Sequence, residues 1–333
     1  MKKKIAVVYG GQSHEHEVSL RSGLTFLQQI DYAKFSVTPV LITKEGVWTK
    51  YKELNSSINS LDELHIDENS QNALTYDWQT NIDVFFPLIH GETGEDGKLQ
   101  GFLELINVPY VGSNVEASAV GMNKVLSKMV ANQLGAVNIV PYTFIRKETY
   151  SSNADITLEF DYPAFVKPAR AGSSVGVSKV YNEGELKVAL NSAFKVDSLV
   201  LIEKGIVGQE IEVAVIGKEN PEASVVGEIE FVSDFYDYEN KYMNDSSIMH
   251  IPARIDGALQ ETVRKQAINV YTSIGCEGYA RVDFFLEKET NLIYFNEINT
   301  SPGMTNKSMF PVLFSNKYSF TELLSKIIEA TIN

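Results

Sequence analysis

Short apolar segments alternate with helical patterns from the start of this chain, and this alternation constrains its fold more than any other feature. Residues 5–9, 35–43 and 84–89 read as strands, while residues 17–29 and 97–106 have the periodicity of helices. The last of these strands is almost entirely apolar, which is typical of a central strand covered on both faces. The pattern predicts an α/β fold, α+β in part, with a parallel sheet in the N-terminal domain.

The length of the chain requires more than one hydrophobic core. A chain of 333 residues exceeds an ordinary single domain, and its elements fall into three groups, at residues 1–112, 113–206 and 207–333. The polar segment 234–249 has no periodicity, and a loop of that length is usually functional or disordered. Beyond the first domain we expect helices at 122–134, 183–193, 259–274 and 320–332, strands at 141–146, 164–167 and 199–203, and an antiparallel pair at 211–216 and 223–229.

Composition argues against several classes of function. A formal charge of −14 is unfavourable for a nucleic-acid partner, which would require a basic surface. No apolar run approaches the roughly 18 residues of a membrane span, and the N-terminal apolar stretch is too short for a signal peptide. The single cysteine, Cys276, rules out an internal disulfide and is expected to serve in packing. These features predict a cytoplasmic protein.

Two short apolar segments near the C-terminus each carry side chains with oxygen ligands. Asp283 lies in the first segment, and Glu297 and Asn299 lie in the second. Residues two apart in a strand share a face, so Arg281 should point to the same side as Asp283. Hard cations such as Mg²⁺ prefer carboxylate and amide oxygens and usually sit beside nucleotide phosphates. The pattern predicts a metal-assisted phosphoryl-transfer site.

Turns after two N-terminal strands could bind ligands. Gly10-Gly11 opens a helix and either directs backbone N–H groups at an anion or is only a tight turn. Glu15, at the start of that helix, could accept an ammonium group. His90 follows the strand at 84–89, at the edge where open α/β sheets bind ligands, although a structural histidine fits the same position.

A loop of small residues after another strand is a further strong signal. Lys167 ends the strand, and Gly172, Ser173, Ser174 and Gly176 follow it. Backbone amides and hydroxyls in such a loop can surround phosphate oxygens, and the lysine would bind phosphate as a point charge. A hairpin with a solvated lysine is the alternative. Because the loop is longer than a tight hairpin needs, phosphate binding is favoured.

Weaker signals complete the set. Glu203 and Glu210 could accept hydrogen bonds from a ribose hydroxyl or an adenine amine, and the segment 234–249 carries a lysine–tyrosine pair. The backbone amides of Gly303 and Met309 could bind a carboxylate or a developing oxyanion. No pair of nucleophile and base stands out in the sequence. The chemistry is therefore expected to rest on positioning and charge neutralisation around a nucleotide, as in phosphoryl transfer.

These motifs occur in an order that matches a known family. The matching blocks are Gly10-Gly11, Glu15, Glu17-Val-Ser, His90-Gly, Gly94-Glu-Asp-Gly97, Gly101, Tyr110-Val-Gly112, Met122-Asn-Lys124, Lys167-Pro, Gly172-Ser-Ser-Val-Gly176, Phe235-Tyr-Asp-Tyr, Lys241-Tyr242, Arg281-Val-Asp283 and residues 296–305. Over essentially the whole chain they resemble the D-alanine–D-alanine ligase family of the ATP-grasp superfamily. Two departures are small: Asn123 stands where the family usually has Asp, and Lys307 stands where a His is common.

The resemblance implies a three-domain ATP-grasp architecture, with ATP held between a central domain at 113–206 and a C-terminal domain at 207–333. It also implies two Mg²⁺ ions, for which Mn²⁺ can substitute. The implied contacts are Lys124 and Lys167 with the ATP phosphates, Glu203, Ile206 and Glu210 around adenine and ribose, Lys241 at the γ-phosphate, and Asp283, Glu297 and Asn299 as metal ligands.

For the substrates, the resemblance implies sites for two D-alanines. Glu15 would receive the ammonium of the first D-alanine, with His90 beside it. Ser173 and Tyr242 would tie Glu15 to a mobile loop at 234–249. The carboxylate of the second D-alanine would be held by Arg281, Gly303, Ser308 and Met309, with Arg281 and Gly303 also facing the tetrahedral intermediate.

The implied activity is ATP-dependent synthesis of D-alanyl-D-alanine for peptidoglycan, by a cytoplasmic homodimer with no nucleic-acid or membrane partner. A D-alanine–D-serine ligase is the alternative within the family, although Tyr242 goes with an amino-acid nucleophile rather than D-lactate. A non-catalytic nucleotide-binding protein would lack a metal ligand or a lysine. Another ATP-grasp carboxylate–amine ligase would lack Glu15, His90 and the Lys241-Tyr242 pair.

Overall fold

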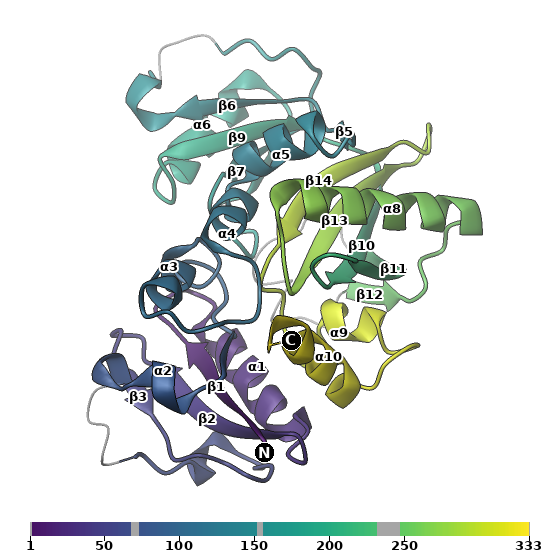
Figure 1. The fold of residues 1–333 in the computed structure, drawn as a ribbon. Helices are drawn as coiled ribbons and strands as arrows, with labels where there is room; N and C mark the ends of the chain where they lie inside the picture. The colour runs from purple at the N-terminus through teal and green to yellow at the C-terminus, as the bar shows by residue number, and fades with distance from the viewer. Residues whose placement is uncertain (1, 68–72, 152–155, 232–246, 333) are drawn as a thin grey trace.

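The computed structural model describes residues 2–67, 73–151, 156–231 and 247–332, which form three β-sheets flanked by helices. Figure 1 shows the sheets in three lobes, with the N-terminal lobe at the bottom, a second lobe at the top and the largest sheet at the right. This mixed α/β architecture is the fold class expected from the sequence. None of the helices among the described residues is both long and apolar enough to cross a membrane.

The first sheet has the strand order β3-β2-β1-β4, and β1 pairs in parallel with both β2 and β4. Its central strands are buried on both faces, as the apolar run at 84–89 predicts. The elements are β1 (Lys3–Gly10), α1 (His16–Gln29), β2 (Phe35–Ile42), β3 (Trp48–Lys50), α2 (Trp78–Asn81), β4 (Val84–Pro87) and α3 (Lys98–Leu105), with 3₁₀ turns at Leu61–Glu63 and Ala73–Thr75. A parallel sheet of this kind directs the ends of β1 and β4 toward one edge, where the turns after both strands meet.

The second sheet is antiparallel and has the order β6-β9-β7-β8. Its strands are β6 (Tyr142–Arg146), β7 (Ala164–Pro168), β8 (Ser178–Val180) and β9 (Leu199–Lys204), and a 3₁₀ turn spans Lys147–Thr149. Helix α6 (Glu183–Ala193) packs Leu186 and Leu190 against Val166 and Ile202 of the sheet. The loop between β7 and β8 carries the Gly/Ser cluster toward the other two lobes.

The third sheet has six strands in the order β12-β11-β10-β13-β14-β5. The predicted pair at 211–216 and 223–229 is antiparallel, as expected. Helix α8 (Gly257–Ile274) covers one face of the sheet, as Figure 1 shows. The strands are β5 (Asn138–Ile139), β10 (Gly208–Ile216), β11 (Glu222–Phe231), β12 (Ser247–His250), β13 (Tyr279–Glu287) and β14 (Ile293–Asn299).

One sequence-based expectation for this part of the chain is confirmed and another is wrong in part. The helix expected at 122–134 is present as α5 (Lys124–Gln133), and a separate helix, α4 (Val115–Met122), precedes it. The two are divided at Asn123, which has extended backbone angles and whose side chain accepts from the amides of Val125 and Leu126. The last residues of the loop expected at 234–249 belong to β12, which pairs with β11. The other residues of that loop, up to 246, lie outside the described part of the chain.

Packing crosses the boundaries of the three sequence segments. Strand β5 and helices α4 and α5 come from the middle segment but pack on the third sheet. Helix α9 (Met309–Leu313) and helix α10 (Phe320–Ile332) come from the last segment, yet Phe310 and Leu323 share a core with Phe26 and Phe86 of the first lobe. Helix α9 packs on β10 and β11 of the third sheet and α10 packs on β4 of the first, so the loop that leads into them lies between these two lobes.

Candidate functional site

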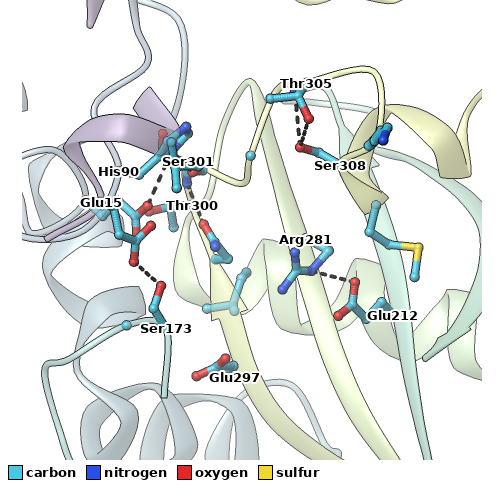
Figure 2. Close-up of a pocket in the computed structure, with 18 of the residues that line it drawn as sticks. Glu15, His90, Ser173, Glu212, Arg281, Glu297, Thr300, Ser301, Thr305 and Ser308 are labelled. Carbon is cyan, nitrogen blue, oxygen red and sulfur yellow. Dashed lines mark hydrogen bonds and ion pairs between the residues drawn. The ribbon is translucent and has the colours of Figure 1, made fainter. Parts of the chain in front are cut away.

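A cavity of about 790 Å³ lies where the three lobes meet. It gathers side chains that are far apart in the sequence, from the turns of the first sheet to the loop after β14. Figure 2 shows several of them around one space. Ten of the residues singled out from the sequence line it: Glu15, His90, Lys124, Ser173, Arg281, Glu297, Asn299, Gly303, Ser308 and Met309.

The floor of the cavity is the β13–β14 pair. Arg281 lies opposite Asn299 and Asp283 opposite Glu297 across the two strands, so the four side chains share a face as the two-residue spacing predicts. Arg281 donates from Nε and Nη2 to the two carboxylate oxygens of Asp283, at 2.8 and 2.7 Å. Its Nε is also 2.9 Å from Glu212 of β10, a contact that Figure 2 marks. Burial lowers the pKa of Arg281, but the two carboxylates outweigh it and raise that pKa well above its ordinary value.

Lys124 contacts both the loop between β7 and β8 and the floor of the cavity. Its Nζ is 2.9 Å from a carboxylate oxygen of Glu297 and donates to the carbonyl oxygen of Ala171 at 3.0 Å. Lys124 is the first residue of α5, so the asparagine cap at 123 sets where this ammonium group enters the cavity. The lysine therefore touches both the carboxylate strand and the Gly/Ser loop.

The oxygen donors are of the type that a hard divalent cation prefers, and they lie on one face of the β13–β14 pair. Asp283 and Glu297 are direct cross-strand neighbours, and Asn299 follows on the same face. Cations of the protein now bind two of them, Arg281 at Asp283 and Lys124 at Glu297. In the described part of the chain no group of three His, Cys, Asp or Glu side chains is arranged to hold a metal ion. The candidate set is thus two carboxylates and one amide.

A buried ion cluster lies beside the cavity. Glu203 of β9 is only 1% exposed and accepts from Lys167 of β7, while Lys128 of α5 is 3.2 Å from its second oxygen. Burial raises the pKa of Glu203, but the two lysines outweigh it and lower that pKa to about 2. Lys128 also donates to the backbone carbonyls of Phe295 and Asn296, at 3.3 and 2.9 Å.

This cluster bears on the sequence-based assignments of Lys167 to phosphate and of Glu203 to the nucleoside. Lys167 is held at the end of its strand as expected, but Glu203 faces two lysines rather than open space. Burial lowers the pKa of Lys167, and the charges of Glu203, Glu297 and Glu210 raise it above its ordinary value, so Glu210 lies near the same cation. Ile206 lies between β9 and β10, close to the same lobe boundary. None of these four side chains lines the main cavity, and neither does Asp283.

Glu15 and the Gly/Ser loop meet across the mouth of the first sheet. Ser173 donates from its hydroxyl to Oε1 of Glu15 at 2.5 Å, a contact drawn in Figure 2. Ser173 has a φ of 53°, in the left-handed region that costs a non-glycine residue roughly 1–2 kcal/mol. A Cβ at Gly172 would lie 2.9 Å from the same oxygen of Glu15, so the glycine permits this close approach. Lys241 and Tyr242, also expected here, lie outside the described residues.

His90 lines the cavity, but both of its ring nitrogens have protein partners. Nδ1 is 2.9 Å from the carbonyl oxygen of Ser301, and Nε2 is 2.8 Å from the hydroxyl of Ser22. The carbonyl oxygen of His90 accepts from Ser13 at 2.6 Å. Burial lowers the pKa of His90, which favours the neutral ring. Its neighbourhood also contains the buried carboxyl of Glu95, at 3.9 Å from Nδ1.

The turn after β14 forms the opposite wall. Ser308 is the residue before α9, and its hydroxyl accepts from the backbone amide of Thr305 at 3.1 Å. A second contact of 2.8 Å joins the hydroxyls of Thr305 and Ser308, as Figure 2 shows. A Cβ at Gly303 would lie 2.9 Å from Ser308 Oγ, so a side chain there would displace this hydroxyl. Met309 begins the short helix α9 directly beyond it.

Sequence reasoning missed three side chains of this region: Ser22, Lys128 and Glu212. Each was hidden by an ordinary pattern. Ser22 lies on the apolar side of a helix, and Lys128 lies one helical turn after Lys124, where a solvated lysine is the usual expectation. Glu212 alternates with apolar residues in a strand. Cys276, by contrast, is buried as expected, and burial raises the pKa of its thiol to about 12.

Comparisons with known proteins agree on one family. A model described as "D-ala D-ala ligase N-terminus" matches residues 4–113, and one described as "D-ala D-ala ligase C-terminus" matches residues 130–329. D-alanine--D-alanine ligase B of Clostridium tetani is 42% identical, over 100% of this chain and 95% of that protein. A D-alanine--D-alanine ligase of Geobacillus kaustophilus is also 42% identical, over 98% and 94%.

Solved structures show the same relationship. The VanG D-Ala:D-Ser ligase of Enterococcus faecalis superimposes with a TM-score of 0.85 at 32% identity, covering 99% of this chain and 100% of that one. The D-alanine-D-alanine ligase of Coxiella burnetii has a TM-score of 0.81 at 30% identity, covering 99% and 94%. The family models and the relatives together establish that this chain belongs to the D-alanine–D-alanine ligase family.

Proposed function

We propose that this protein joins two D-alanine molecules to D-alanyl-D-alanine, using ATP and passing through an acyl phosphate. The observation that carries the proposal is that one cavity joins an acceptor for an ammonium group, Glu15, to a cluster of cations suited to phosphate, Lys124 and Arg281. A carboxylate substrate gripped by its amine at Glu15 would present its oxygens toward those cations. The product would serve as a precursor of peptidoglycan.

In this proposal the carboxylate of the first D-alanine attacks the γ-phosphate of ATP, so that ADP leaves and an acyl phosphate forms. The neutral amine of the second D-alanine then attacks the acyl carbon, phosphate leaves, and the nitrogen loses a proton to give the amide. Lys124 and Lys167 bind phosphate oxygens, and Lys241 is expected to add a third cation at the γ-phosphate. Glu203, Ile206 and Glu210 are expected around the nucleoside. Glu203 contacts both Lys128 and Lys167, and these ion pairs support a role for Glu203 in positioning Lys167.

Asp283, Glu297 and Asn299 would hold two Mg²⁺ ions, or Mn²⁺ in their place. Such ions neutralise charge on the transferring phosphoryl group. For that to occur, Arg281 would turn from Asp283 toward the substrate while keeping Glu212 as its partner. Lys124 would likewise exchange Glu297 for a phosphate oxygen. In this proposal the ion pairs seen here would hold Lys124 near the phosphates and Arg281 near the amino-acid substrate.

The substrates would be oriented by the remaining residues of the cavity. Arg281 and the amides of Gly303 and Met309 would hold the carboxylate of the second D-alanine, with Ser308 as a hydroxyl donor, and Gly303 would also face the tetrahedral intermediate. Ser173 fixes one oxygen of Glu15 and leaves the other for the first amine. Tyr242 is expected to join Ser173 and Glu15 when the site is complete. Water must be excluded throughout because it would hydrolyse the acyl phosphate.

The proposed reaction is tested by phosphate release with ATP, Mg²⁺ and D-alanine. D-alanine as sole amino acid is expected to support turnover, because it can fill both substrate sites. Replacing it with L-alanine is the control for stereochemistry. A folded protein that releases no phosphate with D-alanine would contradict the proposal.

A D-alanine–D-serine ligase is the second candidate, because one close structural neighbour is a D-Ala:D-Ser ligase. The two are separated by product analysis of mixtures that contain D-alanine with D-serine or D-lactate. We expect D-alanyl-D-alanine to predominate even when D-serine is in excess. Predominance of the mixed dipeptide would move the assignment to the second candidate.

Gly172→Ala is expected to weaken binding of the first D-alanine. The new methyl group would lie 2.9 Å from Glu15 Oε1 and would displace this carboxylate, at a cost of about 1.4 kcal/mol or a tenfold rise in KM. The KM for ATP should stay unchanged. Gly257→Ala is the matched control, because a Cβ there meets nothing within 4 Å. An unchanged KM for D-alanine in Gly172→Ala would remove Glu15 from the amine site.

We also propose that the protein is a cytoplasmic homodimer that associates through its first lobe. Exposed apolar side chains on that lobe support this proposal, namely Val47, Ile66, Leu74 and Leu105. Light scattering on the purified protein gives the mass directly. A mass of 37.1 kDa at micromolar concentration, that of one chain, would contradict the dimer.

A further inference from the structure

Within the part of the chain that the structure describes, the hydroxyl of Ser22 links helix α1 to the turn after β14. It is fully buried on the inner face of the helix. Its hydroxyl lies 2.8 Å from Nε2 of His90 and accepts from the backbone amide of Met304 at 3.3 Å. Nothing in the chemistry proposed above uses this serine.

The direction of these hydrogen bonds follows from the partners. The carbonyl oxygen of Ser301 can only accept, so Nδ1 of His90 carries the proton that it shares at 2.9 Å. In a neutral ring Nε2 is then an acceptor, and the hydroxyl of Ser22 donates to it. Because that hydroxyl also accepts from Met304, all four groups are satisfied at once.

This chain of hydrogen bonds attaches the turn at two points. Ser301 is held through its carbonyl and Met304 through its amide, and Pro302 and Gly303 lie between them. The amide of Ser301 is fixed separately, since it donates to Asn299 at 3.0 Å. The backbone of Gly303 is therefore positioned by α1 and by the turn after β4, both of which belong to the first lobe.

We propose that Ser22 and His90 are positioning residues that hold the 301–304 turn so that the Gly303 amide faces the reacting carbonyl. The inference rests on the proposed function, in which that amide stabilises the tetrahedral intermediate. His90 acts through the turn, because both of its ring nitrogens are already bonded to protein. Loss of the link should lower kcat, since a misplaced donor chiefly raises the energy of the transition state.

The same helix offers a matched control. Ser19 is also fully buried, one turn before Ser22, and its hydroxyl donates to the carbonyl of Leu88 at 2.6 Å and accepts from the amide of Gly10 at 2.7 Å. Both contacts of Ser19 stay within the first lobe. Ser19→Ala therefore removes as many buried hydrogen bonds as Ser22→Ala, but leaves the turn attached.

The test compares Ser22→Ala with Ser19→Ala in two measurements. Ser22→Ala is expected to lower kcat for phosphate release about tenfold and to leave the KM for ATP unchanged. The decrease is smaller than the roughly 10²- to 10³-fold loss from deleting an oxyanion donor, because the Gly303 amide is only displaced. Ser19→Ala is expected to keep the kcat of the wild type, although its Tm should fall by about as much as that of Ser22→Ala. Hydrogen–deuterium exchange, which needs no activity, should be faster at residues 300–309 in Ser22→Ala alone.

The outcomes separate this inference from the proposed function. Absence of turnover in the wild type would contradict the proposed function, and faster exchange in Ser22→Ala would still establish the link to the turn. Equal kcat and equal exchange in the two variants would overturn the inference. If Ser22→Ala does not fold, Ser22→Cys keeps the size of the side chain with a weaker donor and should show an intermediate kcat. A Cys variant with wild-type kcat and exchange would also overturn it.

Discussion

Glu297→Ala is expected to abolish ATP-dependent phosphate release while leaving the protein folded. The variant removes one of two carboxylates that face each other across β13 and β14, and with it a proposed ligand for divalent ions. Losing metal-assisted charge neutralisation costs several kcal/mol in the transition state, a decrease in kcat of at least about 10³-fold. The free energy of unfolding should change little, because the Glu297 side chain is 29% exposed.

The control for this prediction is Glu287→Ala, which removes a carboxylate from the far end of β13. Glu287 contacts Thr290 and does not line the cavity, so its loss should leave kcat unchanged. Chelation of divalent cations should stop turnover in the wild type, and Mg²⁺ should restore it. Full activity in a folded Glu297→Ala protein would remove the metal assignment, and Asp283→Ala provides an independent repeat of the test.

Arg281→Met is the second change with a large expected effect, and it acts on both stability and activity. The guanidinium lies between the buried carboxylates of Glu212 and Asp283, which are 6% and 7% exposed. Removing one partner of such a buried pair leaves like charges uncompensated and costs about 3–5 kcal/mol. Activity should fall below detection, because the same group is proposed to bind the substrate carboxylate and the intermediate. Urea unfolding and phosphate release measure the two effects separately.

Two further variants distinguish these effects of Arg281. Arg254→Met also withdraws a guanidinium from a buried carboxylate, Glu228, but away from the cavity, so it should destabilise the protein without lowering kcat. The double variant Arg281→Met with Glu212→Gln should recover part of the stability, since it removes one of the two carboxylate charges left without a partner. It should remain inactive. Recovered activity in the double variant would show that Arg281 serves the fold alone.

Local sequence patterns were sufficient for much of the site. The two-residue spacing of Arg281 and Asp283 placed both on one face, and the structure confirms it with a bidentate ion pair. The Gly/Ser loop after Lys167 and the turn before Glu15 were both expected at ligand-binding edges, and Ser173 and Glu15 do meet there. These predictions succeeded because strand periodicity and the chemistry of small-residue turns depend only on neighbours along the chain.

Other features depended on neighbours in space and could not be predicted. Lys128 looks like a solvated helix residue, but it is 1% exposed because Glu203 and two backbone carbonyls surround it in the folded protein. The break at Asn123 depends on whether its side chain caps the next helix or points outward, and both are compatible with the sequence. Glu203 was expected around the nucleoside, but it faces Lys128 and Lys167, which only the folded chain brings beside it.

The sequence by itself determined the fold class, the order of the longer strands and helices, and the type of chemical group at several edges, because these follow from periodicity and composition. Only the tertiary structure decided which of these groups share a cavity and which neutralise one another. The contact between Ser22 and Met304 joins residues 282 apart, and α10, from the end of the chain, packs on β4 of the first sheet. Such contacts are set by burial of apolar surface between distant segments, and no local pattern encodes which surfaces will meet.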